Sequence, residues 1–296
     1  MPVRTFQPED ADAVAVLSAD CLRGETDFVL NPLWETPAEL FAEFQRHGID
    51  PTEHLLVAEA GDGQVAGVSG FLRRPGAGMA GLVAPIVNDQ ERGKGLGGEL
   101  LRATLAHGAD KLGIGFVVAG IGTRNRSGYS LLTALGFRPV RQHFLMRCDQ
   151  PPDDPTPPVE GLTFQLAEAG EAGELLALYH ACGFEQRAPE AMDATLADGR
   201  HLHAVARHGG RIVAFTEIES HWPRRVWVAF VGVDPGLRGK GVGSALVAWT
   251  LRQLWNAGAE SALLLLSPAN RTAYRAYEKV GFRRHRTFDV LERALP

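Results

Sequence analysis

The chain has 296 residues, of which 45% are hydrophobic and 22% are charged, and its formal net charge is −5. This composition excludes disordered and fibrous proteins, and it provides no broad positive field for nucleic acid or anionic lipid. The length favours two domains of ordinary size over one. We therefore expect a globular protein that binds neither nucleic acid nor membrane.

The N-terminus lacks the apolar stretch of a secretory signal, and no segment reaches the roughly 18 apolar residues that span a bilayer. The three cysteines, Cys21, Cys148 and Cys182, form no Cys-x-x-Cys pair. This pattern favours neither a disulfide framework nor a thiolate metal site. We expect a cytoplasmic protein without a metal.

A proline-rich segment, residues 150–161, divides the chain near its midpoint and is a poor helix or strand. We expect it to link an N-terminal domain, residues 1–149, to a C-terminal domain, residues 162–296. The two domains repeat the same features in order. Thr5-Phe6-Gln7 corresponds to Thr163-Phe164-Gln165, and a stretch typical of a helix follows each.

Each half continues with a hairpin and a third strand, and the third strands are residues 81–87 and 226–233. Each third strand runs into a glycine-rich loop that opens an amphipathic helix. The loops share the order Arg-Gly-Lys-Gly-x-Gly, at residues 92–97 and 238–243. A buried strand follows, and then a short helix that begins at Asn125 or Asn270 and ends in Gly-Phe. Five features in the same order indicate a duplicated domain.

The glycine loops are candidate anion sites. Unpaired amides in the first helical turn and the positive end of the helix dipole attract phosphate, and glycine lets the backbone approach it. The first loop also matches the dinucleotide pattern G-x-G-x-x-G, but the second copy has Ser244 at the last glycine. Because the Walker pattern is also absent, the sequence argues against Rossmann dinucleotide binding and against nucleotide hydrolysis.

These motifs resemble the GNAT superfamily of N-acetyltransferases, whose loop [QR]-x-x-G-x-[GA] holds the pyrophosphate of coenzyme A. The first copy matches with Gln90, Gly93 and Gly95, whereas the second has Gly236 in place of Gln or Arg. The resemblance covers nearly the whole chain. It implies an α/β (α+β) fold of two tandem GNAT-like domains, each with a mixed, mostly antiparallel central sheet flanked by helices.

In that family an Asn begins the last helix, and a Tyr seven residues later protonates the departing thiolate. Asn270 and Tyr277 reproduce this pattern, whereas the first copy has Leu132 at the tyrosine position. The resemblance therefore implies a catalytic C-terminal copy and an N-terminal copy that is degenerate in catalysis.

The resemblance implies an acyl-CoA-dependent N-acyltransferase that moves an acetyl group from acetyl-CoA to an amine of a small molecule or peptide by direct attack. Acetyl-CoA is then the co-substrate, and no metal takes part. The expected cofactor contacts lie in both copies: Val231, Gly232, Val233, Arg238, Gly239, Lys240, Gly241, Val242, Gly243 and Asn270 in the second, and Ile86, Val87, Gln90, Arg92, Gly93, Lys94, Gly95, Leu96, Gly97 and Asn125 in the first.

Glu217 and Glu219 are the candidate bases or amine-binding groups, because residues two apart on a strand share a face. The alternative is that both are ordinary surface carboxylates. His201 and His203 show the same spacing but lack a third metal ligand, so we expect a structural or surface role for them.

The two-copy arrangement is similar to that of mycothiol synthase-like proteins, but that family has a glutamate where Trp227 stands here. Trp222 and Trp227 either floor the acceptor pocket or belong to the core. A non-catalytic acyl-CoA-binding or sensing protein is the alternative function. The sequence leaves open the acceptor, the role of the first copy in binding, and whether the protein is a monomer or a homodimer.

Overall fold

A computed structural model describes residues 2–61, 63–72, 79–168, 170–184, 188–220, 222 and 224–296. The chain divides into two compact units, one of Met1–His143 with Arg286–Pro296 and one of Phe144–His285. This division differs from the expected domains 1–149 and 162–296. The chain passes from one unit to the other within strands β6 (Arg138–Cys148) and β12 (Arg283–Ala294), and not at the proline-rich segment.

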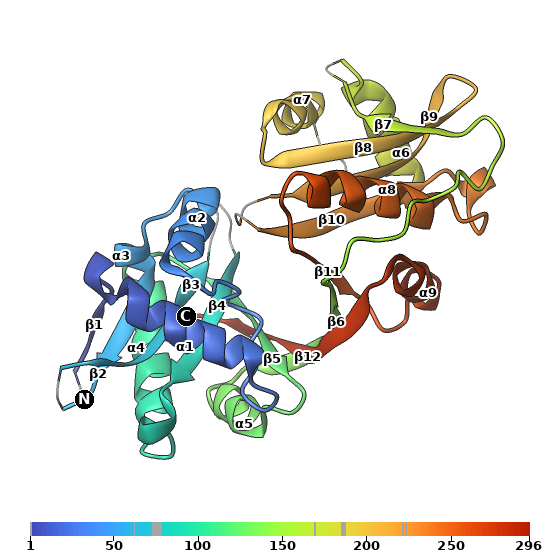
Figure 1. Cartoon of the computed structure of the whole chain (residues 1–296). Helices are drawn as coiled ribbons and strands as arrows, with labels where there is room; N and C mark the ends of the chain where they lie inside the picture. The colour runs from blue at the N-terminus through green and yellow to red at the C-terminus, as the bar shows by residue number, and fades with distance from the viewer. Residues whose placement is uncertain are drawn as a thin grey trace. The chain divides into compact units, whose positions relative to one another are not determined.

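The first unit is built on strands in the order β1-β2-β3-β4-β5-β12 (Figure 1). The bounds of the first five are Val3–Thr5, Leu55–Glu59, Val65–Leu72, Met79–Val87 and Phe116–Gly122. Neighbouring strands are antiparallel except β4 and β5. The parallel pair joins only residues 79–81 to residues 116–118, so the rest of β4 has no partner on that side.

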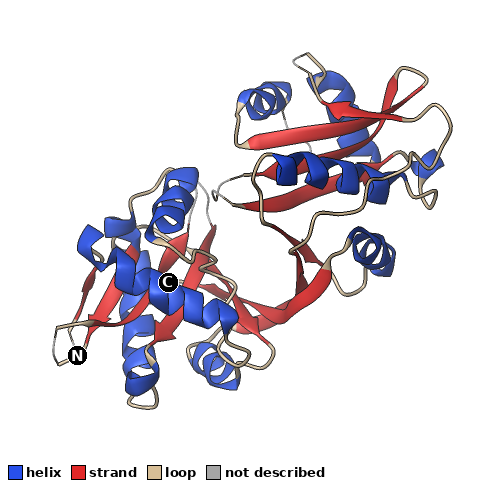
Figure 2. Ribbon diagram, viewed as in Figure 1, coloured by secondary structure: helices blue, strands red, loops and turns tan. Residues whose placement is uncertain are grey.

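Helices cover both faces of the first sheet (Figure 2). Their bounds are Ala11–Arg23 for α1, Pro37–His47 for α2, Pro51–His54 for α3, Leu96–Asp110 for α4 and Arg126–Ala134 for α5. Leu40 of α2 packs in one core cluster with Val57, whereas Leu100 of α4 packs with Leu56 in another. Because neighbouring strand residues point to opposite faces, α2 and α4 lie on opposite sides of the sheet.

The second unit repeats this plan with the order β6-β11-β10-β9-β8-β7. The bounds of the last five are Ser261–Leu266, Arg225–Val233, Arg211–Glu219, His201–His208 and Thr163–Leu166. Here β10 and β11 form the one parallel pair among the described strands of the unit, and it joins only residues 225–227 to residues 261–263. The mixed, mostly antiparallel sheet is confirmed in both copies.

The last strand of each repeat is exchanged between the two units. Residues 144–148 of β6 pair with β11, although β6 ends the first repeat. Residues 288–294 of β12 pair with β5, although β12 ends the second repeat. Each exchanged strand satisfies backbone groups of a strand that would otherwise be a sheet edge. Two intertwined halves therefore complete one another's sheets.

The helices of the second unit are α6 (Ala172–Ala181), α7 (Pro189–Ala197), α8 (Val242–Asn256) and α9 (Arg271–Val280). Leu175 and Met192, from α6 and α7, pack with Phe215 of β9. Leu246 of α8 packs with Ala214 on the opposite face of that strand. The proline-rich segment also packs on this unit, because the Pro152 carbonyl accepts a 2.9 Å hydrogen bond from Arg252.

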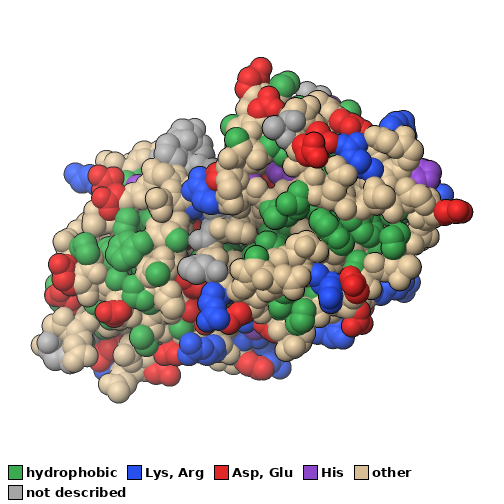
Figure 3. Space-filling view, turned by 45° about the horizontal axis from the view of Figure 1, so that its top comes forward, with side chains coloured by type: hydrophobic (Ala, Val, Ile, Leu, Met, Phe, Trp, Pro, Cys, Tyr) green, Lys and Arg blue, Asp and Glu red, His purple; other side chains and the backbone are tan. Residues whose placement is uncertain are grey.

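The local motifs form as the sequence predicts. Both glycine loops lead into helices, and Gly95 and Gly241 precede them with φ angles of 90° and 85°, which favour glycine. Asn125 and Asn270 cap α5 and α9. No helix in the described ranges has the length and apolar composition needed to cross a membrane. Acidic and basic side chains are interspersed on the face shown in Figure 3.

Candidate active site

Each unit contains a cleft between its glycine loop, the strand before that loop and the helix capped by Asn. The cleft of the second unit has a volume of about 700 Å3, and that of the first unit about 250 Å3. The strands β4 and β10 that border the clefts have lost their parallel partner at this point, which leaves room beside them.

Most of the cofactor residues expected in the second copy line its cleft. They are Val231, Gly232, Val233, Arg238, Gly239, Gly241, Val242, Gly243 and Asn270, and Lys240 lies on the same loop. The loop is held by its own side chains, since Asp234 accepts a 2.8 Å hydrogen bond from the Gly236 amide. The Nε of Arg238 donates to the Val233 carbonyl at 3.2 Å.

All charged side chains among the described residues that line the second cleft are basic. Arg238, Arg271, Arg275 and Lys279 line it, and no Asp or Glu does. The last three lie on α9 at intervals of four residues, which places them on one face of the helix. This basic face was not predicted from the sequence, although its four-residue spacing is visible there.

Tyr277 lies in the same cleft and is half-buried. Its ring packs edge-on against Phe282 at 5.6 Å between centroids. Burial raises the pKa of Tyr277 to about 12. Its phenol therefore keeps its proton across the physiological range, and the hydroxyl makes no hydrogen bond to a described residue.

Glu217 lies outside this cleft, on the face of β9 that α6 covers, and is 1% exposed. The Tyr179 hydroxyl donates to it at 2.6 Å, and ring nitrogens of His201 and His203 lie 3.4 and 3.5 Å from its carboxylate. Burial alone would raise the pKa of Glu217, but hydrogen bonds from the two histidines and Tyr179 outweigh it and lower the pKa. The alternative that Glu217 is an ordinary surface carboxylate is wrong.

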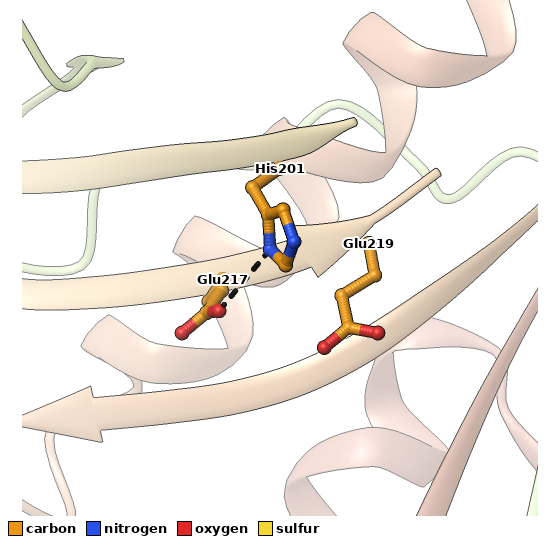
Figure 4. A group of neighbouring side chains, drawn as sticks. All are labelled: His201, Glu217 and Glu219. Carbon is orange, nitrogen blue, oxygen red and sulfur yellow. Dashed lines mark ion pairs between the residues drawn. The ribbon is translucent and has the colours of Figure 1, made fainter. Parts of the chain in front are cut away.

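Glu219 lies on the same face and is 7% exposed, so it too is not a surface carboxylate. Figure 4 shows its carboxylate beside His201 and Glu217, and ligand atoms of the three residues lie within 4.8 Å of one another. The group holds His201 and two carboxylates, and His203 is not among its members. A divalent cation is compatible with this set, but Glu217 already has partners in the protein.

Glu219 pairs directly across the sheet with Trp227 of β10. Directly opposed residues of antiparallel strands point to the same face, so the two side chains are neighbours. Trp227 is half-buried and packs edge-on against the buried Trp222, with 6.4 Å between ring centroids. Trp227 is therefore a neighbour of Glu219, and Trp222 packs on Trp227.

The first cleft holds the corresponding expected residues, namely Ile86, Val87, Arg92, Gly93, Gly95, Leu96, Gly97 and Asn125, but not Gln90 or Lys94. Leu132 lines it at the tyrosine position. Asp27, Glu91 and Arg92 are its charged lining residues. Arg92 is paired with Asp27 at 2.9 Å, and Lys94 is paired with Glu91 at 3.0 Å. The cations of the first loop are thus neutralised locally.

Comparison with known families and curated proteins agrees with the repeat. Residues 2–138 match the acetyltransferase (GNAT) domain, and residues 172–282 match the acetyltransferase (GNAT) family. A mycothiol acetyltransferase from Actinosynnema mirum is 32% identical over 254 residues, which cover 81% of this chain and 83% of that protein. One from Mycobacterium avium is 30% identical over 266 residues, covering 79% and 82%.

Two solved structures share the fold over nearly the whole chain. A GCN5-related N-acetyltransferase from Sphaerobacter thermophilus has a TM-score of 0.80 at 24% identity, covering 99% of this chain and 95% of that one. A tandem GNAT protein from the clavulanic acid biosynthesis pathway has a TM-score of 0.72 at 15% identity, covering 100% and 98%. At these identities the comparison shows a shared fold alone.

Proposed function

The chain belongs to the GNAT acetyltransferase family and is an acetyl-CoA-dependent N-acetyltransferase, and we propose that its chemistry takes place in the second cleft. The observation that carries this proposal is the lining of that cleft, with four basic side chains, no described acidic one, and Tyr277. Coenzyme A carries a pyrophosphate and a 3′-phosphate, which such a lining attracts. The first cleft offers one basic and two acidic residues.

The loop and helix α8 would hold the pyrophosphate. Gly239 and Gly241 let the backbone approach the phosphate oxygens, and the N-terminus of α8 contributes the positive end of its dipole. Neither Arg238 nor Lys240 forms an ion pair with a described acidic residue, so both charges remain available. The acyl-bearing arm would then run along residues 231–233 toward Tyr277.

The reaction would proceed by direct attack of a neutral amine on the thioester carbonyl. The Asp234 amide donates to Val213 of β9 at 2.8 Å, so alternation along the strand turns the amides of Val231 and Val233 toward the cleft. These amides are suited to stabilise the tetrahedral oxyanion. When the carbon–sulfur bond breaks, Tyr277 would give its proton to the departing thiolate.

Glu219 is the proposed base, acting on the ammonium form of the acceptor. It pairs directly across the sheet with Trp227 and faces the same side. Glu217 is a poorer base, because its hydrogen bonds lower its pKa and a weakly basic carboxylate accepts a proton reluctantly. We assign Glu217 a positioning role instead.

We propose a small-molecule primary amine as the acceptor. The similar proteins from Actinosynnema mirum and Mycobacterium avium are named mycothiol acetyltransferases, which makes mycothiol-type amines the first acceptors to test. The tryptophans beside Glu219 provide an apolar border to this acceptor region. Peptide amines are the second class of acceptor, to be compared with the small-molecule amines.

Release of coenzyme A, followed with a thiol reagent across a panel of small-molecule and peptide amines, tests the proposal. Gly241→Glu should abolish turnover, whereas the matched Gly95→Glu should leave most of it. Both substitutions place a side chain at a positive φ beside a glycine loop, so their folding costs are comparable. Loss of turnover in Gly95→Glu alone would move the chemistry to the first cleft.

A further inference from the structure

We infer that residues 27–31 of the chain occupy the path of the acyl-bearing arm in the first cleft, and that the protein binds a single acetyl-CoA. This inference rests on the proposed path of the acyl-bearing arm in the second cleft. The segment of residues 27–31, here called the plug, follows α1. In the first unit it lies where the arm would run between the ends of β4 and β5.

Hydrogen bonds seat the plug on β5. The Leu30 amide donates to the Gly120 carbonyl at 2.9 Å, and the Gly122 amide donates to the Phe28 carbonyl at 2.9 Å. Val29 forms an antiparallel bridge with Ile121. The plug therefore acts as a short added strand, on the side of β5 where pairing with β4 has already ended.

The plug is also held at its start, close to the glycine loop. The side-chain amide of Asn125 donates to the carbonyl of Asp27 at 2.9 Å, and the Asp27 carboxylate pairs with Arg92. In the second copy Asn270 caps its helix but donates to no described residue. The side chains of Asn125 and Arg92, which would face a cofactor in the first cleft, thus bind the plug instead.

The plug is packed into the first unit, since Phe28 and Val29 are 1% and 2% exposed. Glycines on β5 make this approach possible, because a Cβ on Gly120 would lie 2.5 Å from the Cβ of Leu30. The second copy has Leu265 at the position of Gly120, five residues before the capping Asn. Leu265 is 37% exposed, and among the described residues of the second unit no bridge to β11 like that of Val29 to Ile121 is formed.

Strand β4, which borders the first cleft opposite the plug, lacks one backbone amide donor. Pro85 stands two residues before Val87, as Val231 stands before Val233, and proline has no amide hydrogen. In the second cleft the Val231 amide is one of the two donors proposed for the oxyanion. In the first cleft the plug therefore occupies the path of the arm, the loop cations are paired with carboxylates, and the position of Val231 offers no amide donor.

Calorimetric titration of the full chain with acetyl-CoA tests the inference, with one site per chain as the expected result. Gly241→Glu should abolish binding, and Gly95→Glu should change the affinity by less than about twofold. Hydrogen exchange provides a second measurement, because the Leu30 and Gly122 amides should stay equally protected with and without saturating acetyl-CoA.

Two binding sites per chain would overturn the inference and leave the acetyltransferase assignment intact. Faster exchange at Leu30 and Gly122 on addition of acetyl-CoA would also overturn it, because the cofactor would then displace the plug. If instead the wild-type chain shows neither binding nor turnover, the proposed function fails, and the inference that rests on it fails as well.

Discussion

The Tyr179 hydroxyl donates a 2.6 Å hydrogen bond to the Glu217 carboxylate and so ties α6 to β9 inside the second unit. Glu217 is buried, and its hydrogen bonds keep its pKa below the ordinary value of 4.5. A carboxyl whose pKa is lowered on folding adds stability above its unfolded pKa. That stability is lost as the pH falls through the folded value.

Tyr179→Phe should lower the free energy of unfolding at pH 7 by about 1.5–3 kcal/mol, the usual range for a hydrogen bond to a charged group. The difference from wild type should narrow as the pH falls toward about 3, because the less stabilised Glu217 of the variant is protonated first. Urea unfolding at both pH values measures this. Tyr274→Phe is the control, because Tyr274 is half-buried and its hydroxyl makes no hydrogen bond to a described residue.

Tyr277→Phe should lower kcat at least tenfold and leave the dissociation constant of acetyl-CoA nearly unchanged. The variant keeps the ring that packs on Phe282 but loses the proton donor, and general acid catalysis contributes roughly 10²- to 10⁴-fold. Steady-state kinetics and calorimetry measure the two quantities. Wild-type turnover in the variant, with the chemical step rate-limiting, would show that Tyr277 only packs.

The duplicated fold was predictable because its signals are local. A strand, a glycine loop and an amphipathic helix follow one another within about 30 residues, and Asn270 and Gly281 mark the ends of one helix. The exchange of β6 and β12 was not predictable. Which strand completes a sheet depends on pairing between residues such as Leu145 and Leu265, which lie far apart in the chain.

The glycine-loop residues of the candidate site were predictable, and its surroundings were not. The repeat indicated that both clefts were alike, but Asp27 reaches the first cleft from a loop that contains no motif. Glu217 and Glu219 were identified by spacing alone, which gives a shared face but not the identity of the element that covers it. Tyr179 lies on α6, and its hydrogen bond to Glu217 distinguishes the role of Glu217 from that of Glu219.

Arg271→Ala should weaken acetyl-CoA binding by about 3- to 10-fold at low salt, because it removes one of the cations that line the second cleft. The effect should shrink at about 0.5 M salt, where exposed charges are screened. Calorimetry at both salt concentrations measures it. Arg126→Ala is the matched control, since Arg126 follows Asn125 as Arg271 follows Asn270, and it does not line the first cleft.

The last prediction separates the two buried carboxylates. Glu219→Gln should lower kcat/KM at pH 7 by at least tenfold, because the acceptor amine would lose its base. The difference in kcat/KM between Glu219→Gln and the wild type should diminish as the pH rises, since a larger fraction of the amine is then already neutral. Glu217→Gln should instead lower the urea midpoint while the folded enzyme keeps kcat/KM within about threefold, because this carboxylate is committed to Tyr179 and the histidines.

A pH–rate profile of each variant, measured with the best amine of the panel, distinguishes these roles, because a structural defect shifts stability without changing the shape of the profile. The wild-type profile should rise with the deprotonation of the base, and Glu219→Gln should shift that limb toward the pKa of the free amine. If the limb shifts in Glu217→Gln and not in Glu219→Gln, the buried carboxylate held by Tyr179 is the base. Glu219 then only lines the acceptor region beside Trp227.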